Sequence, residues 1–582
     1  MISTLRSLFP YLIRYRWRFA AGFAALGAKS VLTVGIPIAI KFSIDELDAD
    51  FELAVLGQWV GLLLAIALVK GVFQYWMRWI LIGVSRDIEY DLRKDFFASL
   101  LSFSQRFYHS YRTGDLMSRA TSDMEAVRLL LGPGIMYTAD FTLVFLGVLS
   151  VMSLTDWRLT CLVFIPIPVI SLTVSFYGKS IHDCFQRVQE CNGEMSSTVQ
   201  EQLSNIRIVR AFAKQKIGAA RFRVQNDQLV AENVKLIRLW GQFYPLLEVL
   251  IGLTYVIVMW LGGRQVLDGS MTLGSFVMFM SYMTVLTWPL IGFGWVVNIV
   301  QRGTVSLARL NEILKQRPEI HGPGETDDEL IEVRGDLAFE NVTYTYPGSA
   351  HPAVSNINLV IPAGQTVAIL GPTGSGKTTL AGLVARLYDP REGRVLIDGS
   401  DARKLPLLSL RHALGFVPQD TFLFGRSIRD NIAFGALGSE EWEIAEAAEI
   451  AQIAAEVDSF PDRYETVLGE RGVNLSGGQR QRVSIARALL ANPRILILDD
   501  AASSVDAETE GQILRNLEAV MRNRTTLLIT HRVSAARLAD RIVVLERGRV
   551  IEEGLHGDLL QARGRYWELS RKQQLEEELE IV

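Results

Sequence analysis

The stretch "QTVAILGPTGSGKTTLAGLVARLY", residues 365–388, joins a short apolar run to a glycine-rich loop and then to a helical pattern. Residues 371–378 fit the pattern G-x-x-x-x-G-K-[ST]. In such a loop successive backbone N–H groups converge on phosphate oxygens, and the next helix presents its positive N-terminus to them. We expect Lys377 to reach the β and γ phosphates and Thr378 to bind Mg²⁺. The expected phosphate site comprises Gly371, Gly374, Ser375, Gly376, Lys377, Thr378 and Thr379.

A second stretch, "ILILDDAASSVD" (495–506), ends an apolar run in two adjacent carboxylates. Burying an uncompensated charge is very costly, so these acids need a positive partner. A phosphate-binding loop needs an acid at a second strand tip to hold Mg²⁺, and Asp499 is placed to supply it. Asp500 follows directly and can aim at the attacking water. The alternative, a simple strand cap, does not explain why both motifs occur in one domain.

The first 300 residues are far more apolar than the rest. Of the 582 residues 49% are hydrophobic, and the mean hydropathy is +0.21. A membrane-spanning helix needs about 20 mostly apolar residues. We predict six such spans, at 19–40, 56–81, 135–154, 159–177, 245–267 and 273–297. The alternative is six buried helices of a large soluble protein. The first span is too long for a cleaved signal peptide and lacks its cleavage site.

Charge sets the expected orientation of the spans. Arginines precede the first span, the stretches 82–134 and 178–240 are rich in Lys and Arg, and "DELDADFE" (45–52) is acidic. Positive segments stay on the cytoplasmic side. We therefore expect a multi-pass protein of the cell (inner) membrane, with the N-terminus and the C-terminal half in the cytoplasm. A net charge of −4 is too small to imply any partner, and no nucleic-acid partner is expected.

The stretch "LSGGQRQR" (475–482) separates this chain from other phosphate-binding-loop proteins. With it, the chain resembles the ABC transporter family, specifically the exporter-type (type IV) half-transporters. The resemblance covers nearly the whole chain, and the motifs come in the family's order. It implies an all-α six-helix transmembrane domain fused to an α/β P-loop nucleotide-binding domain with an antiparallel β subdomain and a helical signature subdomain. The expected domains are 1–315 (transmembrane), 316–335 (linker), 336–570 (ATPase) and 571–582 (acidic tail).

The resemblance also implies roles for single residues. Tyr346 resembles the aromatic that stacks on adenine, and Gln419 the residue that contacts Mg²⁺ and senses the membrane domain. His531 resembles the switch histidine that holds the γ-phosphate. Asp506 resembles the D-loop acid. The signature residues, which contact the γ-phosphate of the nucleotide held by the opposite subunit, are Ser476, Gly477, Gly478 and Gln479.

One position departs from the family's pattern. The family places Glu after the strand-tip aspartate, and this chain has Asp500, which is one methylene shorter. A misplacement of about 1 Å can lower a rate by about a hundredfold. Half-transporters with this replacement commonly pair with a different chain that keeps Glu, so we favour a heterodimer over a homodimer. The presence of His531 argues against a heterodimer, because ATP sites with low hydrolytic activity often lack this histidine.

Further expectations concern the membrane domain. The segments 107–127 and 203–215 are similar to the family's coupling regions, and their alternative reading is a solvated helical hairpin. Four ionisable residues lie within or near the spans: Lys29, Lys70, Asp140 and Glu248. Facing lipid they would be costly, so we expect them to face the bundle interior or an aqueous cavity, or to lie near the interface.

The sequence thus favours an ATP-driven exporter of amphiphilic cargo such as drugs, lipids or peptides, using ATP and Mg²⁺ and working with a second half-transporter in membrane lipid. Two alternatives within the membrane class stay open: an importer with the same fold and a siderophore-like cargo, and an ATP-gated channel or regulatory membrane protein. A soluble ATPase that clamps DNA is disfavoured by the six spans.

Overall fold

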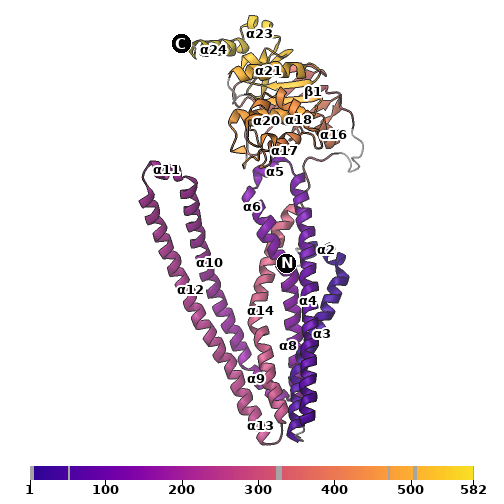
Figure 1. Ribbon diagram of the computed structural model, residues 1–582, viewed down its shortest axis with the longest axis vertical. Coiled ribbons are helices and arrows are strands. Elements are labelled where there is room, and N and C mark those ends of the chain that lie inside the picture. The colour runs from indigo at the N-terminus through magenta and orange to yellow at the C-terminus, as the bar shows by residue number, and fades with distance from the viewer. Residues whose placement is uncertain (1–4, 50–52, 323–330, 470–471, 503–506, 581–582) are drawn as a thin grey trace. The chain divides into compact units, whose positions relative to one another are not determined.

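The computed structural model describes residues 5–49, 53–322, 331–469, 472–502 and 507–580. The chain divides into two compact units, one formed by Met1–Leu101 with Thr113–Gln316 and the other by Ser102–Arg112 with Arg317–Val582. Figure 1 labels their elements.

Every secondary-structure element in the described part of the first unit is a helix. Its long helices are α3 (Arg16–Ala49), α4 (Leu53–Ser102), α8 (Ile135–Thr155), α10 (Pro166–Ser204), α12 (Gln215–Ile257) and α14 (Leu273–Leu314). Its shorter elements are η1 (Arg6–Leu8), α2 (Phe9–Arg14), α6 (Thr113–Ser118), η2 (Arg119–Asp123), α7 (Met124–Leu129), η3 (Leu130–Gly134), α9 (Trp157–Phe164), α11 (Ile206–Ala211), η4 (Val258–Gly262) and α13 (Gly263–Leu267).

Six helical stretches of this unit are long and apolar enough to cross a membrane: Arg16–Leu47, Ala54–Ser102, Thr113–Thr155, Trp157–Ser204, Gln215–Leu267 and Leu273–Leu314. The predicted number is confirmed. The fourth stretch is not one regular helix, because α9 ends before Ile165 and α10 begins at Pro166. Proline lacks the N–H that a continuous helix would need and is tolerated at a helix start. The predicted span 159–177 therefore contains a helix boundary.

Five of the six long helices form two groups. Helices α3, α8 and α14 pack on one another around the buried residues Val148, Phe279 and Tyr282, and the Tyr282 hydroxyl donates a hydrogen bond of 2.8 Å to the carbonyl of Val34. Helices α10 and α12 run side by side as a long antiparallel pair joined by α11. Figure 1 shows this pair diverging from α14 toward the α11 end.

The second unit combines two sheets with helices. Its strands are β1 (Leu337–Tyr344), β2 (Val354–Ile361), β3 (Thr366–Leu370), β4 (Glu392–Ile397), β5 (Ser400–Asp401), β6 (Leu414–Val417), β7 (Ile495–Asp499), β8 (Thr525–Ile529), β9 (Arg541–Glu546) and β10 (Arg549–Gly554). Its helices are α5 (Gln105–Ser110), α15 (Lys377–Val384), η5 (Ala402–Lys404), α16 (Leu407–His412), α17 (Ile428–Ala433), α18 (Glu441–Ile450), α19 (Ala454–Ser459), η6 (Arg463–Glu465), α20 (Gly477–Leu490), α21 (Ala507–Met521), α22 (Val533–Ala536), α23 (His556–Ala562) and α24 (Arg565–Glu580).

The sheets match the expected subdomains. An antiparallel sheet has the order β2-β1-β4-β5, and a six-stranded sheet has the order β10-β9-β3-β8-β7-β6. In the larger sheet β3, β6, β7, β8 and β9 are parallel, and β10 is antiparallel to β9. Strands β3, β7 and β8 are buried at every position, as parallel strands covered on both faces should be. The α/β fold with an antiparallel β subdomain and a helical subdomain is confirmed.

Two of the hydrophobic clusters in this unit contain the helices α15 and α20. One gathers β1, β2, β3 and the helix α15 that follows the glycine-rich loop. The other gathers α17, α18, α20 and α21 against β6 and β7. The glycine-rich loop and the stretch 475–482 therefore belong to separate packing clusters of the same unit.

Candidate functional site

The carboxyl ends of four neighbouring parallel strands meet at one edge of the large sheet. Ile529 of β8 pairs with Ile369 of β3 on one side and with Asp499 of β7 on the other, and β6 follows as the next strand. The segments after these strand ends are the glycine-rich loop, Asp500, His531 and Gln419. Gln419 is exposed, two positions beyond β6. The topology thus brings residues from four separate parts of the sequence to one edge.

The glycine-rich loop has a backbone that requires glycine. Gly371, Gly374 and Gly376 have φ of 155°, 78° and 102°. A Cβ on Gly376 would lie 2.4 Å from the carbonyl oxygen of Ala353, whereas a Cβ on Gly374 would meet nothing within 4 Å. The loop therefore combines a tightly enclosed end with an open middle, as a cradle for an anionic group would.

Lys377 begins α15 and folds back over the loop. Its Nζ donates to the carbonyl oxygens of Gly371 at 2.8 Å and Pro372 at 3.0 Å. Burial lowers the pKa of this ammonium group, and the nearby Asp500 and Asp499 act in the opposite direction. Ser375 is buried beside it, and its hydroxyl has no hydrogen-bond partner among the described residues. A phosphate would offer acceptor oxygens to both groups.

Asp499 ends β7 with a side chain that is almost fully buried. Burial raises the pKa of its carboxyl group, while a hydrogen bond from Thr378 lowers it. Its Oδ2 atom has no hydrogen-bond partner in the described part of the chain. A buried carboxylate oxygen beside a threonine hydroxyl suits Mg²⁺, which binds through one or two carboxylates plus phosphates and water. The described residues hold no cluster of three or more His, Cys, Asp or Glu side chains, and such a cluster is not needed here.

Asp500 adopts a left-handed backbone conformation with φ of 53°. Its amide donates a hydrogen bond of 2.9 Å to the carbonyl of Ile529, which fixes it against the end of β8. Its Oδ1 lies 2.9 Å from Nδ1 of His531, and its side chain is 15% exposed. The two residues expected to act on the attacking water and the γ-phosphate are thus already in contact.

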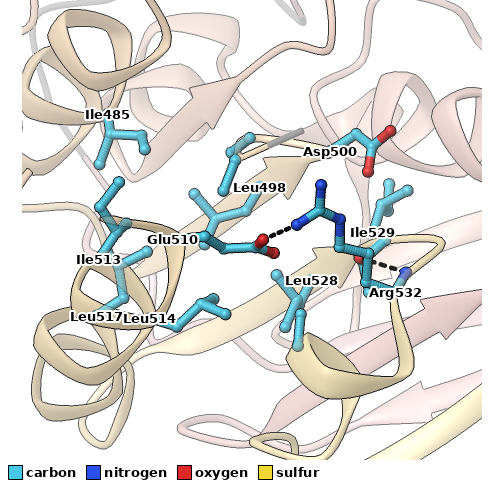
Figure 2. A pocket seen from close by; sticks show the side chains of 14 residues that line it. Ile485, Leu498, Asp500, Glu510, Ile513, Leu514, Leu517, Leu528, Ile529 and Arg532 are labelled. Atoms are coloured by element: carbon cyan, nitrogen blue, oxygen red, sulfur yellow. Dashed lines mark hydrogen bonds and ion pairs between the residues drawn. The ribbon is translucent and has the colours of Figure 1, made fainter. Parts of the chain in front are cut away.

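A small cavity of about 20 Å³ lies behind Asp500, lined mainly by apolar residues of β7, β8 and α21. Figure 2 shows Arg532 reaching across it toward Glu510, with which it forms an ion pair. Glu510 is buried on α21. The pair therefore ties the segment that carries His531 to α21. Sequence reasoning missed it, because nothing in the spacing of the two residues indicates their contact.

Tyr346 stands in an aromatic cluster with Tyr344 and Tyr388, with ring centroids 5.1 to 5.6 Å apart. Its hydroxyl lies 3.1 Å from the Thr379 hydroxyl at the start of α15. The cluster lines a cavity of about 470 Å³. The Tyr388 hydroxyl donates to Gln105 of α5 at 2.6 Å, so α5 packs within this same unit. An aromatic face next to the loop can accept a planar base.

The signature residues form the start of α20. Ser476 is the N-cap: its hydroxyl accepts from the Gln479 amide at 3.2 Å, and Gln479 Oε1 accepts from the Ser476 amide at 2.8 Å. Gln479 also donates to Glu456 at 2.7 Å. Ser476 is exposed and Gly477 half-buried, while Gly478 is buried. This reciprocal capping leaves an exposed helix N-terminus that favours an anion. Asp506 lies outside the described residues.

Comparison with known proteins finds family models, related sequences and a solved structure that this chain resembles. Family models for the ABC transporter transmembrane region and for the ABC transporter match residues 19–290 and 354–503. The chain is similar to a probable multidrug resistance ABC transporter ATP-binding/permease protein, YheI, of Bacillus subtilis (strain 168), with 36% identity over 99% of this chain and 98% of the relative. It is 36% identical to an ATP-dependent lipid A-core flippase of Syntrophus aciditrophicus (strain SB), over 96% and 92% of the two chains.

A solved structure shows the same fold. It is described as a bacterial Atm1-family ABC exporter with ATP bound, and it superposes with a TM-score of 0.80 at 29% identity, covering 96% of this chain and 98% of the other.

Proposed function

This chain belongs to the ABC transporter family as an exporter-type half-transporter, and from that premise we propose that it uses ATP to move amphiphilic cargo out of the cytoplasm or the inner leaflet. The cargo class comprises drugs, lipids or peptides. The proposal rests on one edge of the large sheet, where the phosphate-binding loop, the buried Asp499 and the segment with His531 all follow strand ends. The same chain has six candidate membrane spans. The proposed location is the cell (inner) membrane, with the ATPase unit in the cytoplasm.

Each residue of the edge has a proposed task. The loop amides and Lys377 bind the phosphates of ATP, and Tyr346 stacks on the adenine. Thr378, Asp499 and Gln419 would hold Mg²⁺, which would supply positive charge against the phosphates of ATP. Asp500 orients the attacking water. His531 binds the γ-phosphate and, 2.9 Å from Asp500, fixes that carboxylate in place.

Two glycines of the phosphate-binding loop can be compared directly by substitution. Alanine in a left-handed conformation costs about 1–2 kcal/mol at either Gly374 or Gly376. Only at Gly376 would the added methyl also collide with the Ala353 carbonyl. We expect Gly376→Ala to lower ATP affinity well below that of Gly374→Ala, measured by nucleotide titration of the purified protein. Equal affinities for the two variants would show that the loop's enclosed end does not shape the phosphate site.

A second half-transporter completes the proposed site. The loop and Asp499 cover one side of the triphosphate, so donors from another molecule must cover the other side. Among the described residues, no hydrogen bond or ion pair joins residues 476–479 to the glycine-rich loop of the same chain. The α10–α12 pair also leaves apolar side chains exposed near α11, at Ile208, Phe212 and Ile217. Such exposed apolar residues suit an interface with a partner.

The variant Gly477→Asp tests whether the signature acts on the partner's nucleotide. It places a carboxylate at the helix N-terminus where the phosphate would bind. We expect the complex to lose about tenfold or more in ATP turnover, since a charge-assisted contact is worth about 1.5–3 kcal/mol. The matched control is Gly557→Asp, in the first turn of α23, where an added side chain meets nothing within 4 Å. Unchanged turnover of the Gly477→Asp complex would contradict a role in trans.

The proposed partner is a different chain that carries Glu at the position of Asp500. In such a heterodimer, Lys377, Asp499 and Asp500 form the weak ATP site, and the intact signature of this chain serves the partner's competent site. A homodimer is the alternative. Copurification of a second half-transporter with this chain would favour the heterodimer, and purification of an active complex containing one kind of chain would favour the homodimer.

Accumulation of a fluorescent amphiphile in inside-out proteoliposomes tests the function itself. An exporter concentrates the cargo inside these vesicles when ATP is added outside. An importer with this fold would accumulate cargo in vesicles of the opposite orientation. An ATP-gated channel would let the cargo equilibrate without exceeding the outer concentration, and that result would contradict the proposal.

A further inference from the structure

The side chain of Gln573, on the C-terminal helix α24, contacts the segment that carries His531. Its Oε1 accepts a hydrogen bond of 2.7 Å from the Val533 amide. Its Nε2 donates a hydrogen bond to the carbonyl oxygen of His531. One carboxamide thus satisfies a backbone acceptor and a backbone donor on the two sides of Arg532, in the turn between β8 and α22. The two bonds tie this turn to α24.

Helix α24 is itself anchored near its start. Tyr566 is fully buried in a hydrophobic cluster that includes Leu370 of β3 and Val533 of α22. Its hydroxyl lies 2.6 Å from Nδ1 of His556. Gln573 follows Tyr566 by seven residues, so the two lie on the same face of the helix, about two turns apart. The face of α24 that packs against the sheet therefore also presents Gln573 to the turn.

The turn has a second anchor, on α21. The Arg532 guanidinium forms an ion pair with the buried Glu510 (Figure 2). The Arg532 amide also donates a hydrogen bond of 3.0 Å to the Thr530 hydroxyl within the turn. The backbone around His531 is therefore held by contacts with two separate helices, α21 and α24.

The His531 imidazole depends on such support because it is exposed. Its side chain is 54% exposed, and its Nδ1 lies 2.9 Å from Asp500 Oδ1. An exposed ring has little packing to hold it, so its position follows from the position of its own backbone. A binding or catalytic group must be held to within about 0.5 Å of its productive geometry. Movement of the turn would thus shift the ring relative to the γ-phosphate that it is proposed to bind.

We propose that Gln573 is a positioning residue, which holds the backbone of His531 so that the imidazole meets the γ-phosphate of ATP. The inference rests on the proposed function, in which His531 binds that phosphate. Gln573 does not touch the nucleotide and acts through His531. The C-terminal helix thereby contributes to the discrimination between ATP and ADP at this chain's own site.

The test measures binding of ADP and of a non-hydrolysable ATP analogue, with Mg²⁺, to this chain's own site in the purified dimer with the other site disabled. The variant is Gln573→Met, which keeps an unbranched side chain but loses both hydrogen bonds. We expect the ratio of analogue affinity to ADP affinity to fall by about three- to tenfold, part of the tenfold or more that a hydrogen bond to a charged group is worth. ADP affinity should keep its wild-type value, because ADP lacks the γ-phosphate. A merely structural role would lower both affinities alike.

The matched control is Gln574→Met. Gln574 is exposed and, one residue further along α24, projects about 100° away from Gln573. This substitution should leave both affinities unchanged.

Two further proteins show whether the effect passes through His531. In a His531→Ala protein, Gln573→Met should not change the ratio any further, because coupled residues are not additive. The variant Gln573→Glu keeps an acceptor for the Val533 amide but, as a carboxylate, cannot donate to the His531 carbonyl. It should lower the ratio only when His531 is present.

A wild-type ratio in Gln573→Met, together with a reduced ratio in His531→Ala, would overturn this inference alone. An effect of Gln573→Met that persists undiminished in the His531→Ala protein would overturn it as well. If Gln573→Met no longer binds ADP, the same two comparisons with Gln573→Glu decide. If His531→Ala keeps the wild-type ratio, His531 does not bind the γ-phosphate, and the role proposed for it fails together with this inference. Absence of ATP-driven export would contradict the proposed function without changing these binding ratios.

Discussion

Replacing Lys377 with alanine is expected to lower the ATP affinity of this chain's own site by about 10–100-fold, because a hydrogen bond to a charged group is worth about 1.5–3 kcal/mol and each 1.4 kcal/mol is tenfold. The Lys377 ammonium group bridges the carbonyls of Gly371 and Pro372 at the mouth of the loop. A phosphate bound in the loop would meet this charge in surroundings where burial limits screening by water. The measurement is nucleotide binding to the purified dimer with the other ATP site disabled.

Lys404→Ala is the control for this prediction. Lys404 is an exposed residue of η5 in the same unit, and its replacement removes an equal charge outside the loop. It should leave ATP affinity unchanged. Retained affinity in the Lys377→Ala protein would mean that another group binds the β and γ phosphates.

Replacing Asp500 with glutamate should raise ATP turnover by up to about a hundredfold, the gain that correcting a misplacement of about 1 Å can give. ATP affinity should change little, since the role proposed for this carboxylate is to act on water in the transition state. The left-handed backbone at Asp500 limits the gain, because aspartate tolerates that conformation better than glutamate does. The contact with His531 must also adjust to the longer side chain. Single-turnover and steady-state ATPase rates of the purified chain and of the complex measure the effect.

The companion variant Asp500→Asn separates the two dimer hypotheses. In a complex with a Glu-bearing partner it should cost little, because the partner's site still hydrolyses ATP. In a homodimer it should stop turnover. If the chain alone already hydrolyses ATP briskly and Asp500→Asn abolishes this, Asp500 is an adequate base and the heterodimer argument loses its main support.

Much of the proposed nucleotide site could be predicted because its parts are local in sequence. The loop that begins at Gly371 is recognisable from the strand before it, its glycines and the helix after it. Asp499 is recognisable as the end of an apolar run. The six spans follow from length and composition alone. The pattern S-x-x-Q at Ser476–Gln479 also indicates the observed capping of α20. The sequence analysis predicted only a phosphate-binding role for these residues.

Contacts between distant positions were not predictable in the same way. The pairs Lys29–Asp140 and Arg532–Glu510 join residues on separate helices or loops, and only the packed fold decides which charges meet. The position of α5 within the second unit depends likewise on packing around Tyr388. Spacing along the chain indicates local geometry, whereas a side-chain partner far away in sequence depends on the topology.

The most direct test of the central claim, that ATP hydrolysis at this sheet edge drives export, measures ATP turnover and cargo accumulation in the same inside-out proteoliposomes while Mg²⁺-ATP is varied. Both rates should saturate at the same ATP concentration, cargo should rise above its outer concentration, and a non-hydrolysable ATP analogue should support neither turnover nor accumulation. Cargo that accumulates with the analogue, or that only equilibrates while ATP is hydrolysed, would contradict this claim.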